Sequence, residues 1–267
     1  IPSYYVAREA SGRVKMVLSG DGGDELFAGY NSYQTTFRDY KMSPYKQLTG
    51  LFGFVSGGVN MDFYRPKYDA QRQAFNDAGL RQLLRADVPI SPPANFTLDE
   101  AKGSVDPVTF FQAQDFKTYL VDDVLTKVDR MSMANSLEVR VPLLDHKIIE
   151  LAFSMPLSLK IRLDKDKNKV QTKYILKKSA SRFYPESFLA RPKQGFGIPT
   201  VEWNAGPLRI LIEQELRDEK NQIYNWLRFD YIQTMMDEFF GGRNSLVAKI
   251  WFIFMFSLWQ KHVHQVQ

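Results

Sequence analysis

The clearest change in the pattern of apolar and polar positions lies near the start of the chain. Residues 14–18 form an apolar and β-branched run, interrupted by Lys15, and a glycine-rich turn follows directly. After the turn, Asp24 and Glu25 precede apolar residues, as acidic residues often do in the first turn of a helix. The pattern predicts a strand over residues 14–18, then a tight loop, then a helix.

Most of the remaining pattern is helical. Aromatic residues on one side of residues 107–120 predict a helix that begins at Pro107, and a second helix capped by Asp122 or Asp123 is expected at once after it. Asp145 is predicted to cap a helix over residues 147–155. Further predicted elements are helices at residues 1–10, 63–84 and 172–183, helices beginning at Pro207, Asp230 and Ser245, and a short strand at 159–163.

The most apolar run, residues 250–259, contains no charged side chain. It is too short to cross a bilayer, since a spanning helix needs roughly 20 apolar residues. We therefore expect a buried core helix there and no association with a membrane.

The composition excludes several kinds of functional site. The chain has 267 residues, 44% of them hydrophobic, which is enough for one large or two small cores. It has no Cys, so a disulfide framework, a thiolate zinc site and a cysteine nucleophile are excluded within these residues. This fits a reducing, cytoplasmic compartment. The three histidines, His146, His262 and His264, do not make a metal site.

The net charge of +5 fits either nucleic acid or binding sites for polyanionic small molecules such as ATP. Basic residues gather between Lys160 and Lys178, where Asp164 and Asp166 interrupt them. The interruption favours a solvated loop and helix face over an RNA platform. A nucleic-acid-binding module stays as the alternative, and it predicts an affinity that falls steeply with salt.

The glycine-rich turn carries the candidate chemistry. Gly20, Gly22 and Gly23 let backbone N–H groups approach a ligand closely, and a helix that follows offers unpaired N–H groups to an anion. Asp21, Asp24 and Glu25 would repel a phosphate unless a hard cation such as Mg²⁺ lay between them. The turn therefore predicts a phosphate and magnesium site. The alternative is that Asp24 and Glu25 only cap the helix and complement its dipole.

Four segments carry a resemblance: SGDGGDELFAGY at residues 19–30, DDVLTKVDRMSMANSLEVRVPLLD at 122–145, TKYILKK at 172–178 and RPKQGFGIP at 191–199. Together they resemble the synthetase domain of glutamine-hydrolysing asparagine synthetases and their relatives. They occur in the family's order, from the first strand to the last third of the chain. Any one of these segments is moderate evidence for the family, whereas four of them in the family's order are specific evidence for it.

The resemblance implies a ligase that forms an amide through an acyl adenylate, with ATP and Mg²⁺ required. Aspartate in the namesake enzyme attacks the α-phosphorus of ATP, and ammonia then displaces AMP. Asp24 matches the family's magnesium ligand, and Asp21 falls where the family has an acidic residue tied to adenylate formation. Lys193 matches the catalytic lysine, suited to the charge that grows on the α-phosphate. The positions that line the nucleotide match Ser19, Gly20, Gly22 and Lys193.

Four further residues fall in matching motifs as possible supporting groups: Glu25, Arg130, Glu138 and Arg140. If residues 138–140 are extended, Glu138 and Arg140 point the same way. We expect them to form a buried ion pair that supports the site.

The same resemblance implies the fold class. The parent domain is α/β, with an ATP-pyrophosphatase-like parallel sheet of the adenine nucleotide alpha hydrolase type, and ATP binds at the carboxyl ends of its strands. Residues 1–267 are expected to be its C-terminal portion, mainly helical around one or two strands. The family's SGGxDS pyrophosphate loop and glutaminase domain are not in the sequence, since residues 56–61 have Asn60 and Met61 where that loop has Asp and Ser. The isolated piece is therefore expected to lack full activity.

The physiological carboxylate stays open. Relatives amidate other carboxylates, including sugar-linked ones in polysaccharide pathways, or close β-lactam rings. The expected partners are small molecules, namely a carboxylate, ATP and ammonia from a glutaminase domain, and a homodimer is a further expectation. A non-catalytic interaction domain that has kept the fold is the remaining alternative.

Overall fold

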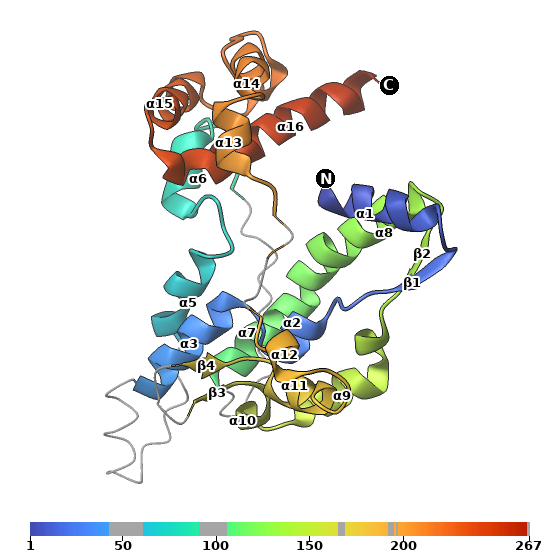
Figure 1. Ribbon diagram of the computed structural model, residues 1–267. Helices are drawn as coiled ribbons and strands as arrows, with labels where there is room; N and C mark the ends of the chain where they lie inside the picture. Colours follow the sequence, from blue (N-terminus) through green and yellow to red (C-terminus); the bar gives the residue numbers. More distant parts are fainter. Residues whose placement is uncertain (43–60, 91–105, 165–168, 192–194, 196, 266–267) are drawn as a thin grey trace. The chain divides into compact units, whose positions relative to one another are not determined.

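The computed structural model describes residues 1–42, 61–90, 106–164, 169–191, 195 and 197–265. The chain divides into two compact units (Figure 1). Unit 1 comprises Ile1–Gln71 and Phe96–Gly195, and unit 2 comprises Arg72–Asn95 and Phe196–Gln267. Both units are mainly helical in their described parts, as the sequence predicts, and the strands belong to unit 1.

Unit 1 contains short helices around two small pairs of strands. Its elements are α1 (Pro2–Ser11), β1 (Met16–Leu18), α2 (Gly23–Leu26), α3 (Asn31–Met42), α5 (Met61–Asp69), α7 (Pro107–Lys117), the π-helix η1 (Leu120–Leu125), α8 (Thr126–Met133), β2 (Glu138–Arg140), the 3₁₀ helix η2 (Pro142–Leu144), α9 (His146–Ser154), α10 (Leu157–Lys160), β3 (Arg162–Leu163), β4 (Val170–Gln171), α11 (Tyr174–Ala180) and α12 (Glu186–Leu189).

The predicted first strand exists but is shorter than expected. β1 pairs in parallel with β2, and Leu18 lies opposite Arg140 in the register. Figure 1 shows the two strands side by side, with α1 along α8. The helices of unit 1 leave part of this strand uncovered: Leu18 is 68% exposed, and Val14 and Met16 are also exposed. Among the described residues β1 has β2 as its one paired strand, so its other edge has no strand beside it.

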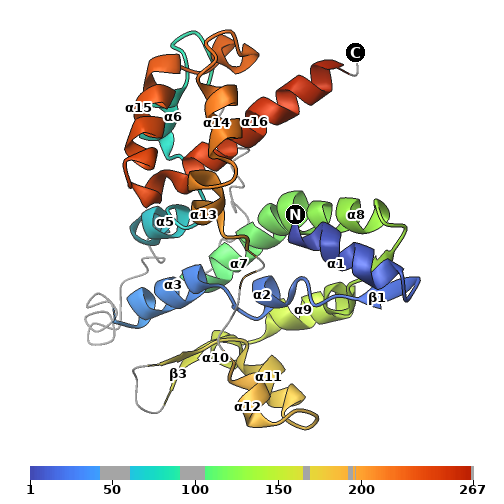
Figure 2. The same ribbon diagram turned by 45° about the horizontal axis from the view of Figure 1, so that its top comes forward.

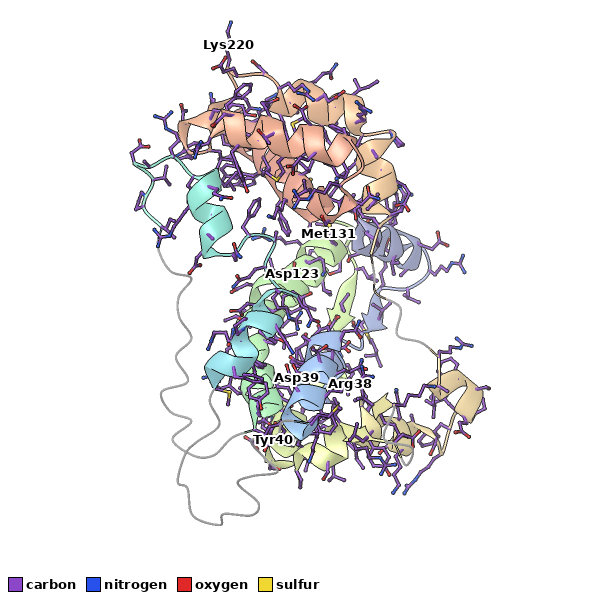
Figure 3. The ribbon with its side chains drawn as sticks, turned by 90° about the vertical axis from the view of Figure 1, so that its left-hand side faces the viewer. Arg38, Asp39, Tyr40, Asp123, Met131 and Lys220 are labelled. Carbon is purple, nitrogen blue, oxygen red and sulfur yellow. The ribbon has the colours of Figure 1, made fainter. Side chains whose placement is uncertain are left out.

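The predicted helix cap at Asp122 or Asp123 is also wrong. The backbone N–H of Asp122 donates to the carbonyl of Thr118 at 2.8 Å, so the hydrogen-bond ladder continues through η1 into α8. Figure 3 labels Asp123 and Met131 along this one helical path. Both aspartates are exposed, and an exposed carboxylate is tolerated within a helix without acting as its cap.

Other boundaries follow local chemistry. Asp145 caps α9 as predicted, accepting from the Lys147 N–H at 2.9 Å. The helix predicted over residues 63–84 is instead two helices, α5 and, in unit 2, α6 (Asp77–Leu83). Asn76 caps the second of them by accepting from the Gly79 N–H at 2.8 Å. Of the strand predicted at 159–163, only β3 forms, antiparallel to β4.

Two apolar clusters stabilise unit 1. The larger one gathers Ala28, Tyr33, Phe37, Tyr64, Tyr68, Val108, Phe111 and Ile161, and the smaller one is centred on Leu26, Phe27 and Ala152. Within the larger cluster the hydroxyls of Tyr33 and Tyr68 both donate to the buried carboxylate of Asp115. At the surface, Asp39 of α3, labelled in Figure 3, pairs with Lys67 of α5 at 2.7 Å.

Unit 2 is built around one apolar cluster. Besides α6 its elements are α13 (Thr200–Ala205), α14 (Arg209–Leu216), the 3₁₀ helix η3 (Gln222–Asn225), α15 (Phe229–Phe240), the 3₁₀ helix η4 (Asn244–Leu246) and α16 (Val247–Gln265), seen from a second side in Figure 2. The expected core helix at 250–259 is only half buried. Ile250 and Ile253 are buried, whereas Phe252 and Trp259 are 60% and 58% exposed. No helix in the described ranges is both long and apolar enough to span a bilayer.

Candidate active site

The candidate site begins where β1 ends. The Ser19 N–H donates to the carbonyl of Arg140 at 2.8 Å, which extends the parallel pairing by one residue. The Ser19 hydroxyl then donates to the carboxylate of Asp21 at 2.5 Å. The loop therefore starts at the carboxyl end of a parallel strand pair, which is where α/β proteins bind ligands.

Gly22 and Gly20 differ in the space around their backbone. Gly22 has φ of +81°, and a Cβ on it would overlap the side chain of Leu144. Gly20 meets nothing within 4 Å of an ideal Cβ, so its backbone borders open space. A ligand can approach the backbone at Gly20 without a side chain in the way. The helix predicted after the turn exists as α2, but it has only one turn and so offers few unpaired N–H groups to an anion.

Asp24 lies against a lysine from a distant segment. Its carboxylate oxygen is 3.1 Å from the Nζ atom of Lys173, and both side chains are about one quarter exposed, at 24% and 26%. The Lys173 N–H also donates to the carbonyl of Phe27 at 3.0 Å. A Cβ on Gly29 would clash with Asp24 Oδ1 and with Lys173 Cε. A side chain at residue 29 would therefore displace the ion pair between the first and third motifs.

Lys173 is the residue that sequence reasoning missed. It belongs to the basic stretch interpreted as a solvated face, although it also lies in TKYILKK. Its φ of +51° is in the left-handed region, at the residue before α11. Non-glycine residues rarely adopt this conformation, so tertiary contacts must hold it. The sequence feature that could have identified Lys173 is its place in the TKYILKK motif.

Glu25 supports the loop from inside the protein. Its side chain is buried, and the Tyr30 hydroxyl donates to it at 2.6 Å. Burial raises the pKa of the Glu25 carboxyl above its usual value, and burial also raises the pKa of Tyr30. Gln112 of α7 donates to the Glu25 carbonyl at 2.5 Å. Glu25 thus ties α2 to Tyr30 and α7, which gives it a structural role rather than that of a surface helix cap.

Lys160 corrects the interpretation of the basic stretch. It is fully buried, with Nζ 3.5 Å from Gln112 Oε1 and 5.2 Å from the ring centroid of Phe153. Burial lowers the pKa of Lys160 to about 8. The first lysine of that stretch is therefore a core residue and not part of a solvated face. Its contact with Gln112 extends the network that begins at Glu25.

The supporting residues on β2 form a different pair from the one expected. Glu138 and Arg140 point to the same side and pair at 2.7 Å, but their side chains are 57% and 64% exposed. The expected buried pair is thus an exposed one, because no layer covers this side of β2 among the described residues. An exposed pair contributes about 1 kcal/mol or less. Arg130 is exposed in the last turn of α8.

Among the residues singled out from the sequence, Lys193, Asp166 and residues 56–60 lie outside the described part of the chain. The proximity of Lys193 to Asp24 thus stays a prediction. Within the described part of the chain no group of three or more His, Cys, Asp or Glu side chains forms a metal site. A magnesium ion bound mainly by ATP phosphates needs only one or two protein carboxylates. A single carboxylate such as that of Asp24 is therefore compatible with such a site.

Comparison with known proteins decides the family. The family model described as Asparagine synthase matches residues 1–261. The chain belongs to the asparagine synthase family.

Relatives of this asparagine synthase family chain are of two kinds. It is 29% identical over 274 residues to asparagine synthetase [glutamine-hydrolyzing] 1 of Bacillus subtilis, covering 97% of this chain and 42% of that protein. It is 33% identical over 192 residues to asparagine synthetase [glutamine-hydrolyzing] 3 of the same organism, covering 72% of this chain and 28% of that protein. Amidase chyE of Penicillium rubens is 22% identical over 265 residues, covering 87% and 39%.

The chain therefore spans about two fifths of the length of the first of these relatives. No solved structure matches it.

Proposed function

We propose that this chain carries part of the synthetase site of an enzyme that amidates a carboxylate at the expense of ATP. The observation that supports this most strongly is the Asp24–Lys173 pair at the carboxyl end of the β1–β2 pair, because it joins two family motifs across the fold. In the proposed reaction a substrate carboxylate oxygen attacks the α-phosphorus of ATP and releases pyrophosphate. Ammonia then attacks the acyl carbon, AMP leaves, and the amide keeps the nitrogen.

The residues suit separate parts of this task. The open backbone at Gly20 lets the nucleotide approach the loop, with Ser19 and Gly22 beside it. The contact between Ser19 and Asp21 fixes the Asp21 carboxylate near the end of β1. Lys173 places a positive charge next to Asp24, which lowers the repulsion between this carboxylate and phosphate oxygens. Lys193 is proposed to stabilise the charge that develops on the α-phosphate.

Asp24 is the residue proposed to hold Mg²⁺. A carboxylate has two oxygens and about four lone-pair sites, so an aspartate can contact a lysine and a metal ion together. The ion would neutralise charge on the pyrophosphate leaving group. Glu25 is an unsuitable ligand because its side chain is buried and accepts from Tyr30.

We also infer that residues 1–267 act as the C-terminal portion of a larger synthetase. The exposed apolar side chains of β1 support this, since strands of parallel sheets are normally covered on both faces. The partial coverage of the relatives agrees with it. A pyrophosphate loop and a source of ammonia from glutamine would then lie in the rest of that protein.

Aspartate is the proposed acyl donor because two of the relatives are named asparagine synthetases. The relative named as an amidase favours a second candidate, a different carboxylate substrate for the same chemistry. A panel of carboxylates in the assay below separates the two.

The test is ATP–pyrophosphate exchange by the full-length polypeptide, measured with and without aspartate. Asp24→Asn removes the charge that the metal needs, and we expect exchange to fall by about 100-fold or more. Asp123→Asn is the matched control, since Asp123 is an exposed aspartate that pairs with Lys127 at 3.4 Å. Exchange at the wild-type rate in Asp24→Asn would refute the proposed role. The 267-residue chain by itself is expected to exchange far more slowly than the full-length polypeptide.

A further inference from the structure

Unit 2 contains a cavity of about 470 Å³ that the proposed synthetase reaction does not use. It is lined by Arg81, Leu84, Arg85, Ala86, Asp87 and Arg228. We call it the arginine pocket. Its volume is in the range of small-molecule sites. Three arginines and one aspartate are among its lining residues, so the charged residues around it are mainly cationic.

A short backbone pairing brings the arginines together. Leu84 and Leu227 form an isolated antiparallel bridge. The Arg85 N–H donates to the Trp226 carbonyl at 2.9 Å, and the Arg228 N–H donates to the Leu83 carbonyl at 2.8 Å. Both arginines come one residue after a bridge leucine, and both line the pocket together with Leu84. They are diagonal neighbours across the pairing, within reach of one ligand.

The two leucines of this bridge pack in or against the apolar core of unit 2, whereas Arg85 and Arg228 are exposed. Leu227 is 7% exposed and belongs with Ile232 and Phe239 to the core of unit 2. Leu227 therefore anchors the pairing in the core, while both arginines are exposed. Arg81, in the last turn of α6, adds a third guanidinium from the helix that leads into the bridge.

The carboxylates nearby do not neutralise the cluster. Arg228 binds Asp230 at 2.7 Å, and Arg85 lies 3.4 Å from Asp87. Arg81 makes no ion pair among the residues that the structure describes. The 3.4 Å contact is long for a charge-assisted hydrogen bond, so an anion can compete with Asp87 for Arg85.

Backbone amides add uncharged donors to the same pocket. The Val88 N–H donates to the Arg85 carbonyl at 3.1 Å, which closes a turn with Ala86 and Asp87 at its centre. In the described ranges neither of these two central amides donates to another protein group. Amides of such turns can bind anions beside a cationic side chain.

We propose that the arginine pocket binds the phosphate group of a small molecule. A carboxylate has two acceptor oxygens, which the fork of one guanidinium can match. Arg228 donates to one oxygen of Asp230 in this way. A phosphate presents more oxygens and up to two charges, so guanidinium groups and turn amides can share it. Inorganic phosphate and organic phosphates have this chemistry in common.

The test is isothermal titration of the 267-residue chain with pyrophosphate in magnesium-free buffer containing EDTA. Arg81→Gln is expected to weaken binding about tenfold, and Arg81→Gln with Arg228→Gln about 100-fold. Arg243→Gln is the matched control, because Arg243 is an exposed arginine of unit 2 paired with Glu238 at 2.6 Å. Thermal unfolding of each variant verifies that it is folded.

Further titrations with phosphate and with AMP identify the source of the phosphate group. Equal affinities indicate an inorganic anion, and tighter binding of AMP indicates a nucleotide. The proposal is overturned if pyrophosphate does not bind at millimolar concentration, or if Arg243→Gln weakens binding as much as Arg81→Gln. A difference between Arg81→Gln and Arg243→Gln reports on the arginine pocket, because neither residue belongs to the proposed synthetase site, so the result does not depend on the proposed synthetase function.

Discussion

The two units bury different kinds of polar side chain. In unit 1 the buried side chains include three ionisable groups, Glu25, Asp115 and Lys160. In unit 2 the buried polar residues within the described ranges are uncharged, and they are Asn204, Asn221, Ser257 and Gln260. Burial of an ionisable group is unfavourable unless hydrogen bonds compensate for the lost water. Unit 1 therefore accepts an energetic cost that unit 2 avoids.

In unit 1 the buried ionisable groups Glu25 and Lys160 lie in a network around the loop that carries Asp24. Glu25 is next to Asp24 and bonds Tyr30, and Gln112 connects the Glu25 carbonyl to the neighbourhood of Lys160. Unit 2 instead relies on one apolar cluster that includes Ile232, Phe239 and Ile253. The chain therefore fixes its candidate site with buried polar contacts, whereas apolar packing stabilises its other unit.

The largest expected effect tests the packing of unit 2. Ile232 of α15 is fully buried, and Ile232→Ala should lower the free energy of unfolding by about 4 kcal/mol through lost burial and a cavity. Ile210→Ala is the control, because Ile210 is 69% exposed in the same unit. Urea unfolding followed by far-UV circular dichroism measures both. Equal losses in the two variants would contradict the assignment of the core.

The next effect concerns the buried lysine of unit 1. The pKa of Lys160 falls from 10.5 to about 8 on folding, so between these pH values the unfolded state binds more protons. This group therefore makes the protein more stable as pH rises from 8 to 10.5, by about 3 kcal/mol. Below pH 8 the lysine is charged in both states, and its burial is unfavourable.

Lys160→Met should remove this rise. The free energy of unfolding, measured from pH 7 to 10.5, is compared among the wild type, Lys160→Met and Lys147→Met, whose lysine is exposed. We expect the difference between wild type and Lys160→Met to change with pH, whereas the difference for Lys147→Met stays constant. A pH-independent difference for Lys160→Met would show that Lys160 is not buried with a lowered pKa.

A somewhat smaller effect is expected at the contact between the two motifs. Gly29→Ala places a methyl group against Asp24 and Lys173, and we expect a loss of about 2 kcal/mol in the free energy of unfolding. Exchange of pyrophosphate by the full-length polypeptide should fall as well, because Asp24 must move. Gly12→Ala is the control, since its Cβ would meet only the Glu9 carbonyl, at an ordinary 3.6 Å. Wild-type stability in Gly29→Ala would mean that Lys173 and Asp24 are not held together.

Local chemistry made part of this architecture predictable from the sequence. The cap at Asp145, the glycine turn after Leu18 and the proline at the start of α7 are encoded within a few residues. The mainly helical character was predicted for the same reason. Asp122 and Asp123 misled because an aspartate favours a cap locally, while the continuous path from α7 to α8 is set by packing of residues such as Leu120 and Val124.

Contacts between distant segments could not be predicted in this way. The parallel pairing of Leu18 with Arg140 and the ion pair of Asp24 with Lys173 each join segments more than 100 residues apart. Lys160 looked like a surface residue because most lysines are exposed, and its burial depends on Gln112 and Phe153 from other helices. The family motifs indicated which segments matter, but not which of their side chains meet.

The smallest effect on the stability of the 267-residue chain is expected at Leu18, and it tests whether β1 is covered in the larger protein proposed above. Leu18 is 68% exposed, so Leu18→Ala should change the free energy of unfolding of the 267-residue chain by less than about 0.5 kcal/mol. If further strands cover β1 in the full-length polypeptide, the same substitution there removes a buried side chain and should cost about 3 kcal/mol. Unfolding of both proteins in urea gives the two values. A small loss in both would mean that β1 stays uncovered, and the proposed extension of the sheet would be wrong.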